Sequence, residues 1–153
     1  MKITIAIPCW SQAQYLPEAI QSALDQTYRD IEIIVVNDGS PDNTAEVASR
    51  YPVTVINQVN KGLASARNTA LMNATGDYFL PLDADDILLP NCVQRIVDFI
   101  ELTHADIISP SFRCFGVAEQ EILLMPDPTA DDFITGNRVA YLSAIKTSVL
   151  RSV

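Results

Sequence analysis

The sequence predicts an α/β fold with a mostly parallel sheet flanked by helices, so that helix, sheet and helix form three layers. Short apolar segments of strand length alternate with longer segments in which apolar residues recur at helical spacing. The first short segment, 3–9, is apolar almost without interruption, as is typical of a strand buried on both faces of a parallel sheet. The 153 residues suffice for one domain with a substantial core, and we expect a single domain over 1–153.

The first expected helix follows the strand 3–9. Pro17 suits its first turn, and four apolar residues then repeat at helical spacing: Ala19, Ile20, Ala23 and Leu24. The second strand is expected over 31–37 and runs into the turn sequence DGSPDNT. A short helix over 45–51 follows this turn.

The third strand is expected at 53–57, where valine, threonine and isoleucine are concentrated. After the loop sequence QVNKG, residues 63–73 are rich in alanine and predict a helix. Gly76 follows this helix as a stop signal. The apolar segment 78–82 then predicts the fourth strand.

The last part of the chain alternates in the same way. A helix is expected over 91–102, because Val93, Ile96, Val97 and Ile100 fall on one face. A further strand is expected at 106–110, and a last strand at 138–145 after a less regular, antiparallel stretch. Thr147 is placed to cap a helix that begins directly after it.

Charge and composition exclude several kinds of function. Nineteen acidic residues against ten basic ones give a net charge of −9, which disfavours binding to nucleic acid. No apolar run approaches the roughly 18 residues that span a bilayer, so we expect no transmembrane segment. The expected location is the cytoplasm, with peripheral attachment at the inner face of the membrane as a further option.

The metal-binding and nucleophilic residue types are sparse. Three cysteines, Cys9, Cys92 and Cys114, stand far apart and are predicted to be reduced thiols. The only histidine is His104. A zinc site or a Ser-His-Asp triad is therefore not expected.

Three of the predicted strands end in polar or aromatic residues. The first ends at Pro8, Cys9 and Trp10, the second reaches Asp38, and the fourth runs into the sequence DADD from Asp83. Ligands of a parallel α/β sheet bind outside the carboxyl ends of its strands. We therefore expect these strand ends to line one crevice.

The acidic sequence needs a physical reason, since Asp83, Asp85 and Asp86 repel one another and are costly to desolvate. An Asp-x-Asp pair where a strand meets a loop suits Mg²⁺ or Mn²⁺, which prefer oxygen ligands and leave positions for phosphate oxygens. The alternative is an acidic turn that water solvates.

Three further side chains each have two interpretations. Trp10 is placed to stack on a flat heterocycle, or else is a core or interface aromatic. Asp38 is placed to accept the imide N–H of a pyrimidine, or else begins an Asx-type turn with Gly39. Arg67 is a surface residue of its helix, or a partner for the aspartates or for a phosphate.

The order of these motifs resembles the family-2 glycosyltransferases of the GT-A fold. It runs from strand-Pro-x-aromatic through VVNDGSPDNT and NKGLASARNTAL to GDYFLPLDADD, and SALDQTYRDIEIIVVNDGS also matches the family's Ser-x-x-x-Gln-x-x-x-x-x-Glu stretch. The resemblance covers residues 3–150. The chain departs from the family pattern in having Trp10-Ser11 for Tyr-Asn and Asn37 for the first aspartate of the turn.

The resemblance implies a role for each matched residue. Pro8 and Cys9 would bring backbone against the nucleoside, Trp10 would lie against the base, and Asp38 would bond its imide edge. The remaining matched positions would contact the donor's base, sugar or diphosphate: Gly62, Arg67, Asp83 and Ala84. Asp85, with Asp83, would ligate the Mn²⁺ or Mg²⁺ that bridges the diphosphate.

The resemblance also implies an activity, namely inverting transfer of a sugar from a nucleotide-diphospho-sugar, most simply a UDP-sugar, to a carbohydrate or lipid-linked acceptor. The family's general base is expected beyond Val153, so no catalytic residue is assigned and the acceptor part is expected to be missing. One alternative is a non-catalytic nucleotide-sugar binding module. A sugar-nucleotide pyrophosphorylase is disfavoured because no glycine-rich phosphate loop follows the first strand.

Overall fold

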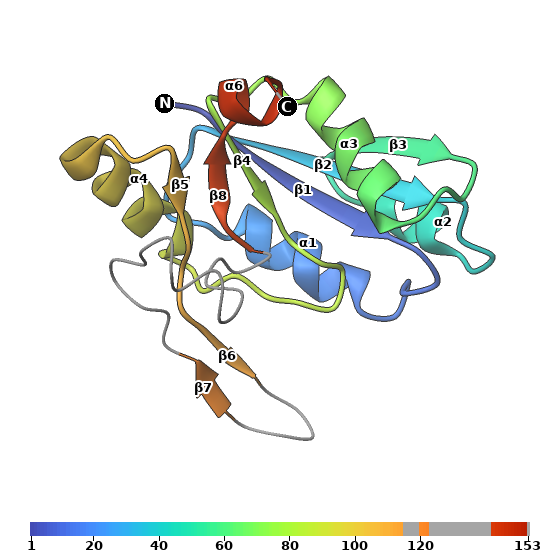
Figure 1. The fold of residues 1–153 in the computed structure, drawn as a ribbon. Helices are drawn as coiled ribbons and strands as arrows, with labels where there is room; N and C mark the ends of the chain where they lie inside the picture. Colours follow the sequence, from blue (N-terminus) through green and yellow to red (C-terminus); the bar gives the residue numbers. More distant parts are fainter. Residues whose placement is uncertain (115–119, 123–141, 153) are drawn as a thin grey trace.

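The computed structural model describes residues 1–114, 120–122 and 142–152, and its core is a six-stranded sheet (Figure 1). The strand order is β3-β2-β1-β4-β8-β5. Strands β1 (Ile3–Cys9), β2 (Ile31–Asp38), β3 (Thr54–Gln58) and β4 (Tyr78–Pro81) are parallel. The short strand β8 (Ala144–Lys146) runs antiparallel between β4 and β5 (Ile107–Ile108), which makes the sheet mixed.

The central strand is buried on both faces, as its sequence predicts. Ile3, Ile5 and Ile7 belong to one core cluster and Ala6 to another, and all four are fully buried. The register pairs β1 with β2 from Ile3 opposite Ile31 to Cys9 opposite Asn37, so the carboxyl ends of the two strands lie level.

Helices cover both faces of the sheet and complete three layers. On one face, α1 (Leu16–Leu24), α2 (Thr44–Ala48) and α4 (Cys92–Thr103) contribute apolar side chains to the larger cluster. On the other face lies α3 (Leu63–Asn73), which packs through its alanines (Figure 1). Two of these alanines, Ala66 and Ala70, are fully buried, and their small side chains let the helix approach the strands closely.

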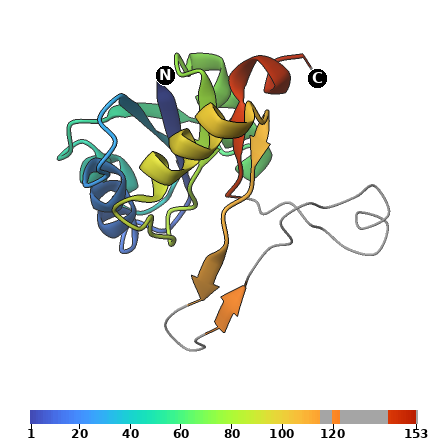
Figure 2. The same cartoon turned by 90° about the vertical axis from the view of Figure 1, so that its left-hand side faces the viewer.

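Three further short elements complete the described chain. Strands β6 (Phe112–Cys114) and β7 (Gln120–Ile122) pair antiparallel, and Figure 2 shows them extending away from the six-stranded sheet. Helix α6 (Thr147–Leu150) follows β8. Within the described residues, no helix has the length and apolar character required to cross a membrane.

The predicted elements are all present, but several ends differ. Helix α2 stops at Ala48 instead of reaching residue 51, and β3 lies one residue later than predicted. Strand β5 is only two residues long, because its pairing with β8 involves Ile107 and Ile108 alone. Of the last predicted strand, 138–145, the first four residues lie outside the described ones, and β8 includes only the last two, Ala144 and Ile145, before it ends at Lys146.

The predicted capping role of Thr147 is wrong. Thr147 is the first residue of α6, and the residue before the helix is Lys146. The Thr147 hydroxyl instead donates a 2.7 Å hydrogen bond to the carbonyl of Gly76, and its N–H donates to the carbonyl of Asp77. This side chain therefore ties α6 to the turn before β4.

Candidate functional site

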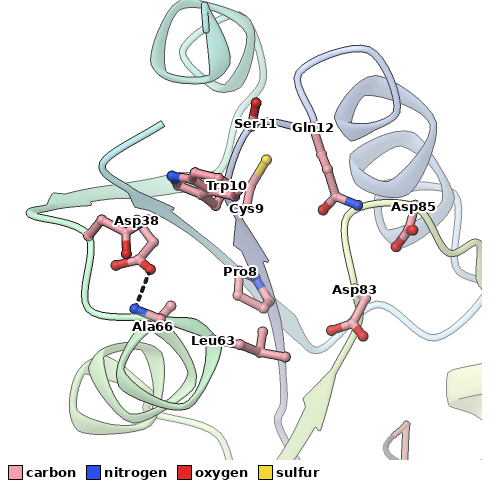
Figure 3. A pocket seen from close by; sticks show the side chains of 12 residues that line it. Pro8, Cys9, Trp10, Ser11, Gln12, Asp38, Leu63, Ala66, Asp83 and Asp85 are labelled. Atoms are coloured by element: carbon pink, nitrogen blue, oxygen red, sulfur yellow. Dashed lines mark hydrogen bonds between the residues drawn. The ribbon is translucent and has the colours of Figure 1, made fainter. Parts of the chain in front are cut away.

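A cleft of about 810 Å³ opens at the carboxyl ends of β1, β2 and β4, within the usual size range of small-molecule sites. The end of β1 and the loop after it line one part through residues 8–12, and Asp38 lines the part next to β2. Leu63 and Ala66 line it from α3, and Asp83 and Asp85 line it from the segment after β4 (Figure 3).

The cleft brings together most of the residues predicted for the site. Seven of them line it: Pro8, Cys9, Trp10, Asp38, Gly62, Asp83 and Asp85. The other two, Arg67 and Ala84, are not among its lining residues in the described part of the chain. Ala84 is buried in the main core cluster, and Arg67 forms an ion pair with Asp83.

Trp10 lies 53% exposed at the cleft, on a loop whose backbone is held in place. Ser11, the next residue, has a positive φ of 56°, in the left-handed region that non-glycine residues seldom adopt. Its N–H donates to Oγ of Ser40, and that hydroxyl donates to the carbonyl of Cys9. The indole is therefore an exposed aromatic on a fixed support, and it does not belong to the core.

Asp42 provides a second anchor for the same loop. Its Oδ2 accepts a hydrogen bond from the N–H of Ala13, and its Oδ1 accepts from the N–H of Thr44 at the start of α2. Burial alone would raise the pKa of Asp42. Hydrogen bonds from the Thr44 hydroxyl and from these two N–H groups lower it by more, so the pKa lies below its usual value. The DGSPDNT turn thus holds the loop that carries Trp10.

Asp38 is buried, with 2% of its surface exposed, and holds the loop between β3 and α3. Oδ1 accepts from Gln58 Nε2 at 2.7 Å and from the N–H of Lys61 at 2.9 Å, while Oδ2 accepts from the N–H of Gly62 at 2.8 Å. Burial raises the pKa of Asp38, yet these hydrogen bonds lower it more, so it lies below its usual value. A carboxylate has about four acceptor positions, so one remains on Oδ2 for a ligand.

Glycine at position 39 allows this loop to pack against the turn after β2. Gly39 has a φ of +65°, and a Cβ there would lie 2.6 Å from the backbone nitrogen of Asn60. Asn37, which replaces the family's first aspartate, donates from Nδ2 to Asn57 and accepts from the N–H of Ser40. Both features are structural supports of the cleft.

Arg67 and Asp83 form an ion pair of 2.7 Å between Nη2 and Oδ1. The two side chains are 27% and 26% exposed, so the pair is partly shielded from water. Nε of Arg67 is buried and has no hydrogen-bond partner within the described residues. Of the interpretations open for Arg67, the structure favours a partner for the aspartates.

The carboxylate of Asp85 is free to take a ligand. Its side chain is exposed at the cleft and makes no hydrogen bond or ion pair with the described part of the chain. Oδ2 of Asp83 is likewise not used by the ion pair. Carboxylate oxygens are ligands that Mg²⁺ and Mn²⁺ prefer, so Asp83 and Asp85 are the cleft residues that could hold such an ion together with phosphate and water. Residues 1–114, 120–122 and 142–152 contain no group of three or more acidic, histidine or cysteine side chains arranged to hold a metal.

The sequence pattern did not assign a role to Gln26, which holds the segment after the aspartates. It is fully buried, donates from Nε2 to the carbonyl of Leu89, and accepts at Oε1 from the N–H of Val93. Ser22, one turn earlier, accepts from the N–H of Leu88. The matched Ser-x-x-x-Gln spacing was the available signal, but only the fold shows what the two side chains touch.

Other cleft residues missed from the sequence are Ser11, Gln12, Asn60, Leu63 and Ala66. Leu63 and Ala66 lie three apart on α3, so helical spacing would have put them on the same face once one was placed. Ser11 and Gln12 directly follow Trp10, and their place after a strand end was the available signal.

The family model described as Glycosyl transferase family 2 matches residues 4–148 of the chain. The chain is 39% identical over 115 residues to the uncharacterized glycosyltransferase EpsJ of Bacillus subtilis, covering 72% of this chain and 33% of that protein. It is 36% identical over 123 residues to the glycosyltransferase GlyA of Streptococcus pneumoniae, covering 77% and 18% respectively. The chain thus spans a third or less of these two curated relatives.

Solved structures resemble the fold at lower sequence identity. TarS 1–349 of S. aureus in complex with UDP-GlcNAc has a TM-score of 0.88 at 22% identity, covering 99% of this chain and 47% of that one. The mannosyltransferase PcManGT of Pyrobaculum calidifontis, in complex with GDP-Man and Mn²⁺, has a TM-score of 0.73 at 21% identity, with 99% and 46% covered. These likenesses confirm the predicted GT-A fold, and the chain belongs to glycosyl transferase family 2.

Proposed function

We propose that this chain binds a nucleotide-diphospho-sugar, most simply a UDP-sugar, together with Mn²⁺ or Mg²⁺, for inverting sugar transfer to a carbohydrate or lipid-linked acceptor. One observation carries the proposal: a single cleft has the exposed indole of Trp10 at one side and, at the other, the carboxylate of Asp85, which has no partner in the described part of the chain. A nucleotide-sugar has a flat base and a diphosphate that need these two kinds of group.

The nucleoside end of the donor is assigned to the strand ends of β1 and β2. Trp10 stacks on the base, and backbone at Pro8 and Cys9 contacts the nucleoside. The remaining acceptor position on Asp38 Oδ2 receives the imide N–H of the base, which uracil has and adenine lacks. Because Asp38 also holds the N–H of Gly62, it fixes the loop that borders the base.

The diphosphate end is assigned to the segment after β4. Asp85 and the free oxygen of Asp83 hold the cation, while Arg67 fixes the orientation of Asp83. When bound, the cation supplies Lewis-acid stabilisation of charge on the leaving nucleoside diphosphate. Two structurally similar proteins support this assignment, since TarS was solved in complex with UDP-GlcNAc and the mannosyltransferase in complex with GDP-Man and Mn²⁺.

The enzyme is favoured over a non-catalytic nucleotide-sugar module, because the curated relatives are glycosyltransferases by name. No described residue of the cleft is assigned as the general base. The acceptor and the cytoplasmic location stay predictions from the sequence.

The assignment of the base site is tested by calorimetric titration with UDP. Trp10→Ala should weaken binding by about 1–3 kcal/mol, the range measured for aromatic stacking on bases. Tyr15→Ala is the matched control, because Tyr15 is a similarly exposed aromatic nearby that does not line the cleft. Equal losses in the two variants would show that Trp10 does not contact the base.

A further inference from the structure

Gln12 lines the cleft but has no role in the site described so far. Its side chain is partly buried, and Figure 3 shows its carboxamide pointing into the cleft on the side of Asp85. Within the described chain this carboxamide makes no hydrogen bond. It is therefore a polar group presented to the cleft without a partner from the protein.

The backbone of Gln12 is held on both sides. The preceding N–H, of Ser11, donates to Ser40, and the following N–H, of Ala13, donates to Asp42. The carbonyl of Gln12 accepts from the N–H groups of Tyr15 and Leu16, where α1 begins. A side chain on such a fixed support binds a ligand with little loss of backbone freedom.

The chemistry of a carboxamide fits this acidic side of the cleft. A lysine or arginine here would pair with Asp85 and compete with a metal ion for its oxygens. A neutral amide leaves the carboxylates free, and its N–H₂ group still donates hydrogen bonds to an oxygen anion. Since Trp10 and Asp38 are assigned to the base, the anion nearest the acidic side is the diphosphate.

We propose that Gln12 binds the diphosphate of the donor, with Nε2 donating a hydrogen bond to a phosphate oxygen. The inference rests on the proposed function, because it requires a nucleoside diphosphate held at Asp83 and Asp85. The diphosphate would then be contacted from two separate segments: the loop after β1 through Gln12, and the segment after β4 through the aspartates. Gln12 is in this account a binding residue and takes no part in proton transfer.

The experiment compares Gln12→Met, which keeps the length of the side chain but cannot donate, with Gln14→Met. Gln14 is an exposed glutamine of the same loop and does not line the cleft. Each protein is titrated with UDP and with UMP in the presence of Mn²⁺, and thermal unfolding midpoints are recorded. If methionine lowers the midpoint of the Gln12 variant, Gln12→Ala takes its place.

The expected result is a Kd for UDP about ten-fold higher in Gln12→Met, the effect of losing one hydrogen bond to a charged group. The Kd for UMP should change by about two-fold or less, and Gln14→Met should match the wild type with both ligands. An unchanged Kd for UDP, or equal weakening of UDP and UMP, would overturn the diphosphate contact alone. A wild-type protein that does not bind UDP would overturn the proposed function as well.

Discussion

Nη2 of Arg67 donates a 2.7 Å hydrogen bond to Oδ1 of Asp83, so one oxygen of an aspartate at the cleft is already occupied by the protein. The pair joins α3 to the segment after β4 across 16 residues of sequence. Among the described residues, neither Oδ2 of Asp83 nor the carboxylate of Asp85 has a partner, so these oxygens are open to ligands. The arginine thereby orients one carboxylate without closing the site.

The ion pair gives a first prediction. Arg67→Met should lower the free energy of unfolding by about 1 kcal/mol, since a partly shielded pair is worth somewhat more than an exposed one. A double-mutant cycle with Asp83→Asn, measured by urea denaturation, should show that the two losses are not additive. Arg95→Met, at an exposed arginine of α4, is the control and should change little. Additive losses at Arg67 and Asp83 would contradict the coupling.

The positive φ of Ser11 gives a second prediction. Ser11→Val should cost about 1–3 kcal/mol of stability, because a β-branched residue is strained in the left-handed region. Ser11→Asn should be tolerated, since asparagine adopts this conformation readily and is the residue common in the family. Neither change removes the backbone N–H that donates to Ser40. Equal unfolding midpoints for valine and asparagine in a thermal melt would show that the backbone at position 11 is not strained.

Gln26 gives a third prediction, about the support behind the aspartates. Gln26→Leu leaves the N–H of Val93 without its partner and removes one of the two hydrogen bonds to the carbonyl of Leu89, which also accepts from the N–H of Cys92. We expect a loss of about 1–3 kcal/mol in the free energy of unfolding. Gln94→Leu is the matched control, because among the described residues the Gln94 side chain bonds only Asp98, at the surface. This variant should stay within about 0.5 kcal/mol of the wild type. Similar denaturation midpoints for the two variants would mean that Gln26 does not hold this segment.

The lowered pKa of Asp38 gives a fourth prediction, about pH. A carboxyl whose pKa is lower in the folded state stabilises the fold above its unfolded pKa, about 3.9, and this stabilisation is lost as pH falls through the folded value. The free energy of unfolding should therefore decrease as the pH is lowered from about 5 towards 2. Asp38→Asn should be less stable at neutral pH and should show a shallower decrease. An identical slope in the variant would show that Asp38 does not contribute to this dependence.

The strand ends were predictable from the sequence because the carboxyl ends of parallel strands share one edge. That rule placed Trp10, Asp38 and Asp85 near one another, and the structure puts all three on one cleft. The partners of Asp38 were not predictable. Gln58, Lys61 and Gly62 lie 20 to 24 residues later, and only the packing of β3 beside β2 brings them to its carboxylate.

The same limit explains the other differences. Pairing of Arg67 with Asp83 depends on how α3 lies on the sheet, which helical periodicity does not specify. The length of β5 depends on a partner strand from much later in the chain, β8, and no local signal near Ile107 reports that partner. Threonine is a common helix-capping residue, but the hydroxyl of Thr147 donates its hydrogen bond to the carbonyl of Gly76, 71 residues earlier in the chain. Local propensity was overridden in these cases by contacts distant in sequence.

The most direct test of the account is the affinity for UDP measured by calorimetry with Mn²⁺ and, separately, with EDTA, in the wild type and in Asp85→Asn. Asp85 is exposed at the cleft without a partner in the described chain, so its replacement should leave the fold intact. The account predicts that Mn²⁺ tightens UDP binding in the wild type and that Asp85→Asn removes most of this gain. Equal affinity for UDP with Mn²⁺ and with EDTA in the wild type would contradict it.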